Sequence, residues 1–221
     1  QIIEYFRGKK MWSFAKVTML AWECLLRVQS EGLVVYKGSP SDATNMVGRP
    51  NGLWQDSAGN LCYRLAQRKH RKHGSLLMRT CRCAEVPQAY CGVCQLTQSL
   101  SAFDVGEQMW SMDENDFLRQ IKRAMVLLGI PGSDRVGLKA FRSGRATSLL
   151  SQNKALGTIL KMGEWRSKAV VNYANVDEVN CNAFLNMQFE ESDGEDIIKI
   201  HPKGQAKGCK QTGSQVVKPA K

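Results

Sequence analysis

The first part of the chain holds one dense apolar segment followed by a polar stretch. Residues 9–28 (KKMWSFAKVTMLAWECLLRV) predict a largely buried helix that ends near Arg27. The run LVVY at 33–36 is β-prone and predicts a short strand. Residues 37–59 are rich in Gly, Pro, Ser, Asn and Asp, which is typical of a loop.

Two further apolar runs flank a strongly basic connector. The runs LCYRLA at 61–66 and SLLMR at 75–79 predict two strands, and the connector between them reads QRKHRKHG. This spacing favours an antiparallel pair that presents its basic turn to a partner.

A helical period returns after the middle of the chain. Ser111 is the predicted N-cap of a helix, and Glu114 three residues later forms a capping box with it. Gly129 and Pro131 predict where this helix ends. The apolar stripe of the helix is formed by Phe117, Ile121, Ala124, Met125 and Leu128.

More helices are predicted in the last third. We expect helices at about 138–152 and 154–162, and short helical pieces at 167–174 and 177–189. The element order is therefore helix, small sheet and several helices. The predicted fold class is mainly α with a small antiparallel β-sheet (α+β).

Composition divides the chain and restricts its partners. Residues 1–190 are expected to form one domain, with a Cys-rich insertion at 80–97, and the Lys-rich residues 191–221 are expected to be a disordered tail. The formal net charge is +11, which favours a polyanionic partner, nucleic acid ahead of an anionic membrane. No apolar run reaches the roughly 18 residues of a membrane span.

The segment KAFRSGRAT at 139–147 concentrates cations without acids. Lys139 and Arg142 lie three positions apart and share a helix face, and Arg145 follows. A guanidinium fork on a buried helix matches the oxygens of a phosphate. A solvated basic helix face is the alternative explanation of this segment taken alone.

The order of a few polar residues resembles the catalytic signature of the tyrosine recombinases, the phage-integrase family. The resemblance covers roughly residues 10–190, and its most specific part is KAFRSGRAT followed by GEWRS and VVNYA. The wording of GEWRS and LLRVQSEGL further resembles recombinase-like proteins of eukaryotic (dinoflagellate) mobile elements. The positions that match the signature are Arg27, Lys69, Lys139, Arg142, Trp165 and Tyr173.

The resemblance implies the integrase catalytic-domain fold and a DNA strand-transfer reaction. The hydroxyl of Tyr173 would attack a DNA phosphodiester, giving a 3′-phosphotyrosyl link and a free 5′-hydroxyl that a second DNA end later uses. Arg27 and Arg142 would stabilise the charge that gathers on the phosphate. No metal is implied for this chemistry. We expect the sequence to be the catalytic-domain part of a protein whose N-terminal domain grips the other face of DNA.

The remaining roles come from the same resemblance. Lys69 would protonate the leaving 5′-oxygen, and Trp165 would donate its indole N–H to the phosphate. Lys139 stands where the family usually has His, as a phosphate contact or proton shuttle. The family usually has an acid three residues after its first Arg, where this chain has Ser30, with Glu31 one position further. The tyrosine also follows Trp165 one residue sooner than is typical.

Partners follow from this assignment. Double-stranded DNA is the expected partner, bound by a homo-oligomer, in the nucleus of a eukaryote or otherwise intracellularly, with no membrane role. The residues expected to contact DNA are Arg68, Lys69, His70, Arg71, Lys72 and Arg145.

Two other functions fit parts of the pattern. A catalytically inactive, recombinase-derived DNA-binding protein would keep the phosphate clamp without cleavage. A zinc-stabilised interaction domain would make the resemblance incidental. Taken singly, Trp165 and Tyr173 also fit core packing, and Arg27 fits a helix C-terminal cap.

Four of the eight cysteines lie close together in the sequence. Cys81, Cys83, Cys91 and Cys94 offer four soft ligands, which suit tetrahedral zinc in a structural clip that braces the sheet. Four reduced thiols on a surface insertion are the alternative, and an iron–sulfur cluster fits less well. His70 and His73 are expected to face DNA or solvent.

Overall fold

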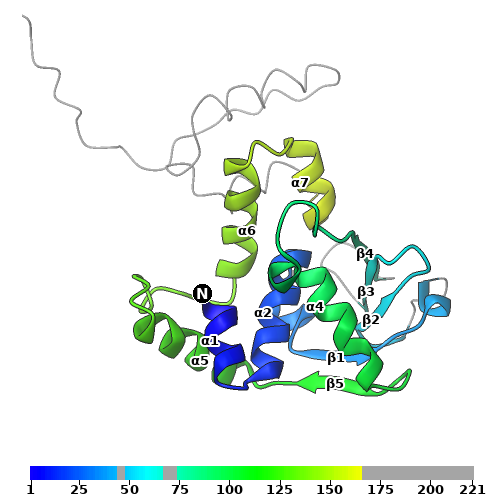
Figure 1. The fold of residues 1–221 in the computed structure, drawn as a ribbon, viewed down its shortest axis with the longest axis horizontal. Coiled ribbons are helices and arrows are strands. Elements are labelled where there is room, and N and C mark those ends of the chain that lie inside the picture. The colour runs from blue at the N-terminus through cyan, green and yellow to red at the C-terminus, as the bar shows by residue number, and fades with distance from the viewer. Residues whose placement is uncertain (44–47, 67–73, 166–221) are drawn as a thin grey trace, which may run out of the picture.

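The computed structural model describes residues 1–43, 48–66 and 74–165. Within them the chain is a mixture of helices and a five-stranded sheet (Figure 1), as expected for α+β. The basic turn at 67–73 lies outside the described residues, as do both helices predicted beyond 166, Tyr173 and the tail at 191–221.

The sheet is mixed rather than antiparallel, which corrects the sequence prediction. Its strand order is β4-β3-β2-β1-β5. β1 and β2 run parallel, with Tyr36 beside Gly52, whereas the other neighbouring pairs are antiparallel. The strands are β1 (Val34–Lys37), β2 (Gly52–Gln55), β3 (Leu61–Leu65), β4 (Ser75–Arg79) and β5 (Gln108–Ser111).

The sequence does not predict the parallel pair, because β2 lies inside the segment 37–59 that was expected to be a loop. Only Leu53 and Trp54 are strongly apolar in this strand, and the residues before it are typical of turns, so no alternating pattern marks it. The connection from β1, which contains the 3₁₀ helix η1 (Pro40–Ala43), is held by buried Arg64. Its guanidinium bonds the Pro50 carbonyl at 2.7 Å and pairs with Asp42 at 2.9 Å.

The predicted first helix, at residues 9–28, is shorter in the structure. α2 (Trp12–Cys24) ends three residues before Arg27, because Leu25 adopts a left-handed backbone with φ of 49°. Arg27 is instead the N-cap of the short α3 (Val28–Glu31).

An unpredicted helix, α1 (Ile2–Gly8), packs on α2. Its seven residues are too few to show a helical period.

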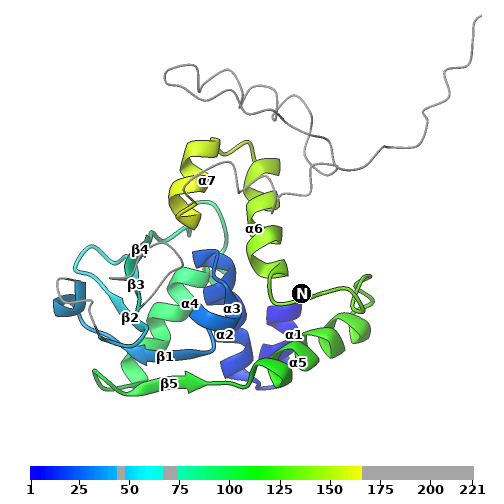
Figure 2. The same cartoon turned by 180° about the vertical axis from the view of Figure 1, so that it is seen from behind.

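The main core lies between the sheet and the helices. α2 and α4 (Gly92–Gln98) pack against the sheet, with fully buried Leu20, Tyr63 and Leu96 among the core residues. The 3₁₀ segments η2 (Gln88–Tyr90) and η3 (Ser99–Ala102) flank α4. The view from behind shows α1 and α5 together beside α2 (Figure 2).

The cap of α5 (Glu114–Leu127) differs from the prediction. Ser111 is the last residue of β5, where it pairs with Val34, so it cannot cap the helix. Asp113 is the N-cap, and its carboxylate accepts a bond from the Asp116 backbone N–H at 2.8 Å. The predicted apolar stripe is confirmed at the four buried positions of α5, which are Phe117, Ile121, Ala124 and Met125.

The last two described helices agree with the sequence within two residues at each end. α6 (Ala140–Ser151) and α7 (Leu156–Gly163) form a helical hairpin, and the end of α7 lies near β4 (Figure 1). A second, small core joins this hairpin to the end of α2. It consists of Leu25, Ala146, Leu149, Leu150 and Ile159. In the described ranges, no helix combines the length and apolar character needed to cross a membrane.

The turn into β4 provides a test of the hairpin. Gly74 has φ of 81°, and a Cβ there would lie 2.3 Å from the Leu65 carbonyl oxygen. We expect Gly74→Ala to lower the free energy of unfolding by at least about 1–2 kcal/mol, measured by denaturant titration. Gly137→Ala is the matched control because a Cβ at Gly137 meets nothing within 4 Å. Equal stability of the two variants would contradict this turn.

Candidate functional site

Arg142 of α6 is a buried cation that joins two helix ends. Its side chain is 3% exposed. Nη1 donates to the Leu25 carbonyl at 2.8 Å and Nη2 to the Gly163 carbonyl at 2.7 Å. The guanidinium therefore bridges the C-terminal ends of α2 and α7.

Arg79, at the end of β4, bridges the same two ends. Its Nε donates to the Glu23 carbonyl at 2.7 Å and its Nη2 to the Met162 carbonyl at 2.8 Å. No motif in the sequence marks this residue. A cation directly after the apolar run SLLM is the only sequence signal for it, and it does not reveal carbonyl partners.

The backbone explains why both arginines find acceptors here. Leu25 after α2 and Glu164 after α7 have left-handed φ values of 49° and 51°. The last carbonyls of a helix lack intrahelical partners and carry the negative end of its dipole. Cationic N–H donors satisfy these carbonyls and neutralise their charge.

A buried carboxylate brings Arg27 to the same place. Glu31 is 1% exposed, and its two carboxylate oxygens lie 3.9 Å from Nη1 of Arg27 and 4.0 Å from Nη1 of Arg142. Glu31 Oε2 also accepts from the Arg27 backbone N–H at 2.9 Å, while the Tyr63 hydroxyl donates to its carbonyl. The acid beside Arg27 is thus Glu31, one position after Ser30.

Trp165 covers the guanidinium of Arg142. The Cζ atom lies 4.3 Å from the ring centroid, which is a cation–π distance. A Cβ at Gly163 would lie 2.0 Å from the Trp165 ring, so the glycine allows the indole to lie against the end of α7.

The structure thus brings together three of the six predicted catalytic residues: Arg27 and Arg142 lie beside Glu31, and Trp165 lies over Arg142. Lys139 is the exposed N-cap of α6, in the turn before Arg142. Lys69 and Tyr173 lie outside the described residues, and so do the predicted DNA contacts Arg68, His70, Arg71 and Lys72.

Arg145, the remaining predicted DNA contact, is buried inside the protein. Its guanidinium lies 5.5 Å from the Trp22 ring centroid and 4.0 Å from the Glu23 carboxylate. Burial lowers the pKa of Arg145, and the Glu23 carboxylate opposes that shift. The Arg145 side chain is therefore too buried in this structure to contact DNA.

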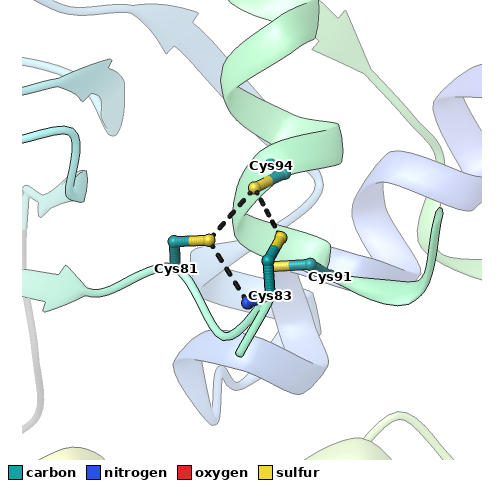
Figure 3. A group of neighbouring side chains, drawn as sticks. All are labelled: Cys81, Cys83, Cys91 and Cys94. Atoms are coloured by element: carbon teal, nitrogen blue, oxygen red, sulfur yellow. Dashed lines mark hydrogen bonds between the residues drawn. The ribbon is translucent and has the colours of Figure 1, made fainter. Parts of the chain in front are cut away.

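The four clustered cysteines lie together, as their spacing predicted (Figure 3). Their sulfur atoms are all within 4.8 Å of one another, with Cys81 and Cys83 at 3.3 and 3.4 Å from Cys94. These distances exceed a disulfide bond of about 2.05 Å. The second pair lies at the start of α4, with Cys91 as N-cap, rather than in a loop. These four sulfurs could hold a metal ion such as zinc.

Backbone N–H groups point at the sulfurs. Cys83 N–H donates to the Cys81 sulfur at 3.3 Å, and Arg82 N–H donates to the Cys91 sulfur at 3.4 Å. The first of these bonds is the main reason that the pKa of Cys81 is lowered to about 7. Burial is the main reason that the pKa of Cys94 is raised. Metal ligation requires thiolates, which such donors stabilise.

The arrangement at Glu31 can attract an anion. Two guanidinium groups and one carboxylate leave one net positive charge, and the Arg27 side chain is 35% exposed.

The chain matches no protein-family model, no curated protein and no solved structure.

The bridging role of Arg142 can be tested by stability. We expect Arg142→Lys to lower the free energy of unfolding by about 2–3 kcal/mol, because one ammonium cannot serve both carbonyls. Arg119→Lys is the control, since Arg119 is exposed and pairs with Asp116 on the surface, and it should cost less than about 1 kcal/mol. Equal denaturation midpoints for the two variants would show that the bridge contributes nothing.

Proposed function

We propose that this chain is a catalytic domain of the tyrosine-recombinase type that binds double-stranded DNA and transfers its strands. The observation that carries the proposal is that Arg27 and Arg142 both lie beside one buried carboxylate, Glu31, with Trp165 over the guanidinium of Arg142. These side chains come from α3, α6 and the end of α7. A set of unrelated core residues has no reason to follow the order of that signature and also meet.

The proposed reaction uses the positive charge of this cluster. The Tyr173 oxygen attacks the phosphorus, the bond from phosphorus to the 5′-oxygen breaks, and the leaving oxygen takes a proton from Lys69. The phenol proton passes to a neighbouring base. Arg27, which is partly exposed, contacts the phosphate first, and preorganised cations stabilise the transition state more than the ground state.

A catalytically inactive, DNA-binding descendant is the second candidate. The observation that favours it is the environment of Arg142, whose guanidinium bonds two main-chain carbonyls under the Trp165 ring. In that form the guanidinium supports the fold and Arg27 alone meets DNA. Cleavage requires Trp165 to move aside so that a phosphate reaches Arg142.

Covalent trapping distinguishes the two candidates. The substrate is a pool of duplexes with randomised sequence around a nick, labelled at the 5′ end of the strand to be cut. Cleavage next to the nick releases a short 5′-hydroxyl fragment and leaves the label on the protein. We expect a labelled band that survives denaturing electrophoresis, and Tyr173→Phe should abolish it while leaving DNA affinity nearly unchanged.

Tyr90→Phe is the matched control, because Tyr90 is an exposed tyrosine of η2 and should leave the adduct intact. DNA binding without an adduct would support the inactive descendant. A wild-type protein that neither binds the pool nor forms an adduct would contradict the proposed function.

We also propose that the cysteine cluster holds one structural Zn²⁺. Tetrahedral zinc with Zn–S bonds of about 2.3 Å places its sulfurs roughly 3.8 Å apart. The sulfur separations of 3.3 and 3.4 Å, with all pairs within 4.8 Å, lie around that value. Four thiolates leave no open position for a substrate, so the ion would serve the fold.

Metal analysis tests this assignment. Protein purified without a metal-binding tag should carry one zinc per chain by elemental mass spectrometry, and Cys91→Ser/Cys94→Ser should lose it. Cys62→Ala is the control, because Cys62 is buried in β3 away from the cluster. Zinc removal should lower thermal stability, since structural zinc binding is coupled to folding. Metal-free protein of unchanged stability, or a visible iron–sulfur absorption, would refute the zinc site.

A further inference from the structure

Each cysteine pair has a neighbour that touches Glu23 of α2. Arg82, between Cys81 and Cys83, donates from Nη2 to Glu23 Oε1 at 2.9 Å. Gly92, directly after Cys91, lies so close that a Cβ there would be 2.7 Å from Glu23 Cγ. The sulfurs of Cys81 and Cys83 point toward Cys94 (Figure 3), and the residue between them extends its side chain to Glu23. A metal bound by both cysteine pairs would therefore hold Arg82 and Gly92 against the Glu23 side chain.

Glu23 passes this constraint to α6. Its second carboxylate oxygen lies 4.0 Å from Nη2 of Arg145, and both side chains are buried. The Nε of Arg145 is a buried donor with no hydrogen-bond partner among the described residues. The Glu23 carboxylate and the Trp22 ring therefore both stabilise the positive charge of Arg145. Arg142 lies three positions earlier on the same helix, on the same side.

The main chain of α2 provides a second connection to the site. The Glu23 carbonyl accepts from Arg79, two residues before the first cysteine, and the Leu25 carbonyl accepts from Arg142. The residue that contacts Arg82 and Gly92 therefore lies on the helix end whose carbonyl positions Arg142.

We propose that Glu23 is a positioning residue that couples metal binding at the four cysteines to the site formed by Arg27, Glu31 and Arg142. Loss of the metal releases Arg82 and Gly92 from Glu23, frees the Arg145 end of α6 to shift, and weakens phosphate binding at the site. The part of this inference that concerns DNA rests on the proposed function, whereas the structural coupling does not.

Fluorine NMR of protein labelled with 5-fluorotryptophan measures the coupling without DNA. The chain has five tryptophans, which single Trp→Phe variants assign. Removing zinc from the wild type should shift the Trp22 and Trp165 signals, because each ring lies on an arginine of α6. Trp54 and Trp110, buried in the sheet, should stay in place. In Glu23→Gln, which should still bind one zinc, metal removal should no longer shift Trp165.

An unchanged Trp165 signal in the metal-free wild type would overturn the proposal, as would an equal shift in Glu23→Gln. If metal removal unfolds the chain, zinc-loaded variants decide instead. Arg82→Met should shift Trp165 with zinc in place, and Arg82→Lys should restore the signal because an ammonium can still reach Glu23. A Trp165 signal that ignores Arg82→Met, or that Arg82→Lys does not restore, would also overturn it.

DNA affinity for a mixed-sequence duplex tests the functional part. Arg82→Met should weaken binding about tenfold relative to the wild type, and Arg82→Lys should recover most of it. Equal affinities of the two zinc-loaded variants would contradict control of the phosphate site by the metal. If the wild type binds no DNA, the proposed function fails, and the fluorine signals still decide the coupling.

Discussion

The packing of the α6–α7 hairpin on α2 and β4 depends on two arginines that lie between two helix ends. The C-termini of α2 and α7 both carry the negative end of a helix dipole, and without a cation between them their carbonyls would repel one another at close range. Arg79 from β4 and Arg142 from α6 each donate to both ends. Four segments of the chain are thereby fixed by two side chains, and the small core around Leu25 and Ile159 closes beneath them.

The same arrangement gives the proposed active site its charge and its rigidity. Glu31 orders Arg27 and Arg142 without neutralising both, so the pair keeps a net attraction for an anion. The cysteine cluster contacts α2 through Glu23, and the proposed coupling to the arginine site depends on this contact. In our proposal a metal at the cysteines influences where Arg142 lies, because the charged side chains between them are buried and close together, so a shift of one displaces the next.

The sequence predicted the elements whose patterns are local. α5, α6 and α7 have a helical period, β3 and β4 are clear apolar runs, and the cysteine spacing predicted the cluster. β2 and α1 are too short to show a period, and the left-handed Leu25 that ends α2 early has no marker in an apolar run. Arg27, Arg142 and Trp165 were identified through the resemblance. Glu31, Glu23 and Arg79 act through tertiary contacts, which spacing along the chain does not reveal. The catalytic roles of all six matched residues stay predictions: Arg27, Lys69, Lys139, Arg142, Trp165 and Tyr173.

The place of β1 between β2 and β5 has a consequence for the order in which the protein folds. Val34 and Val35 pair with Ser111 and Trp110 of β5, far along the chain, and the other edge of β1 pairs in parallel with β2. The pairing of β1 with β5 closes a long loop, which slows folding. While the chain emerges from the ribosome, β1 therefore exposes an apolar strand edge until residue 111 has been made. Such an edge recruits other chains, so nascent or truncated forms ending before β5 depend on chaperones to avoid aggregation.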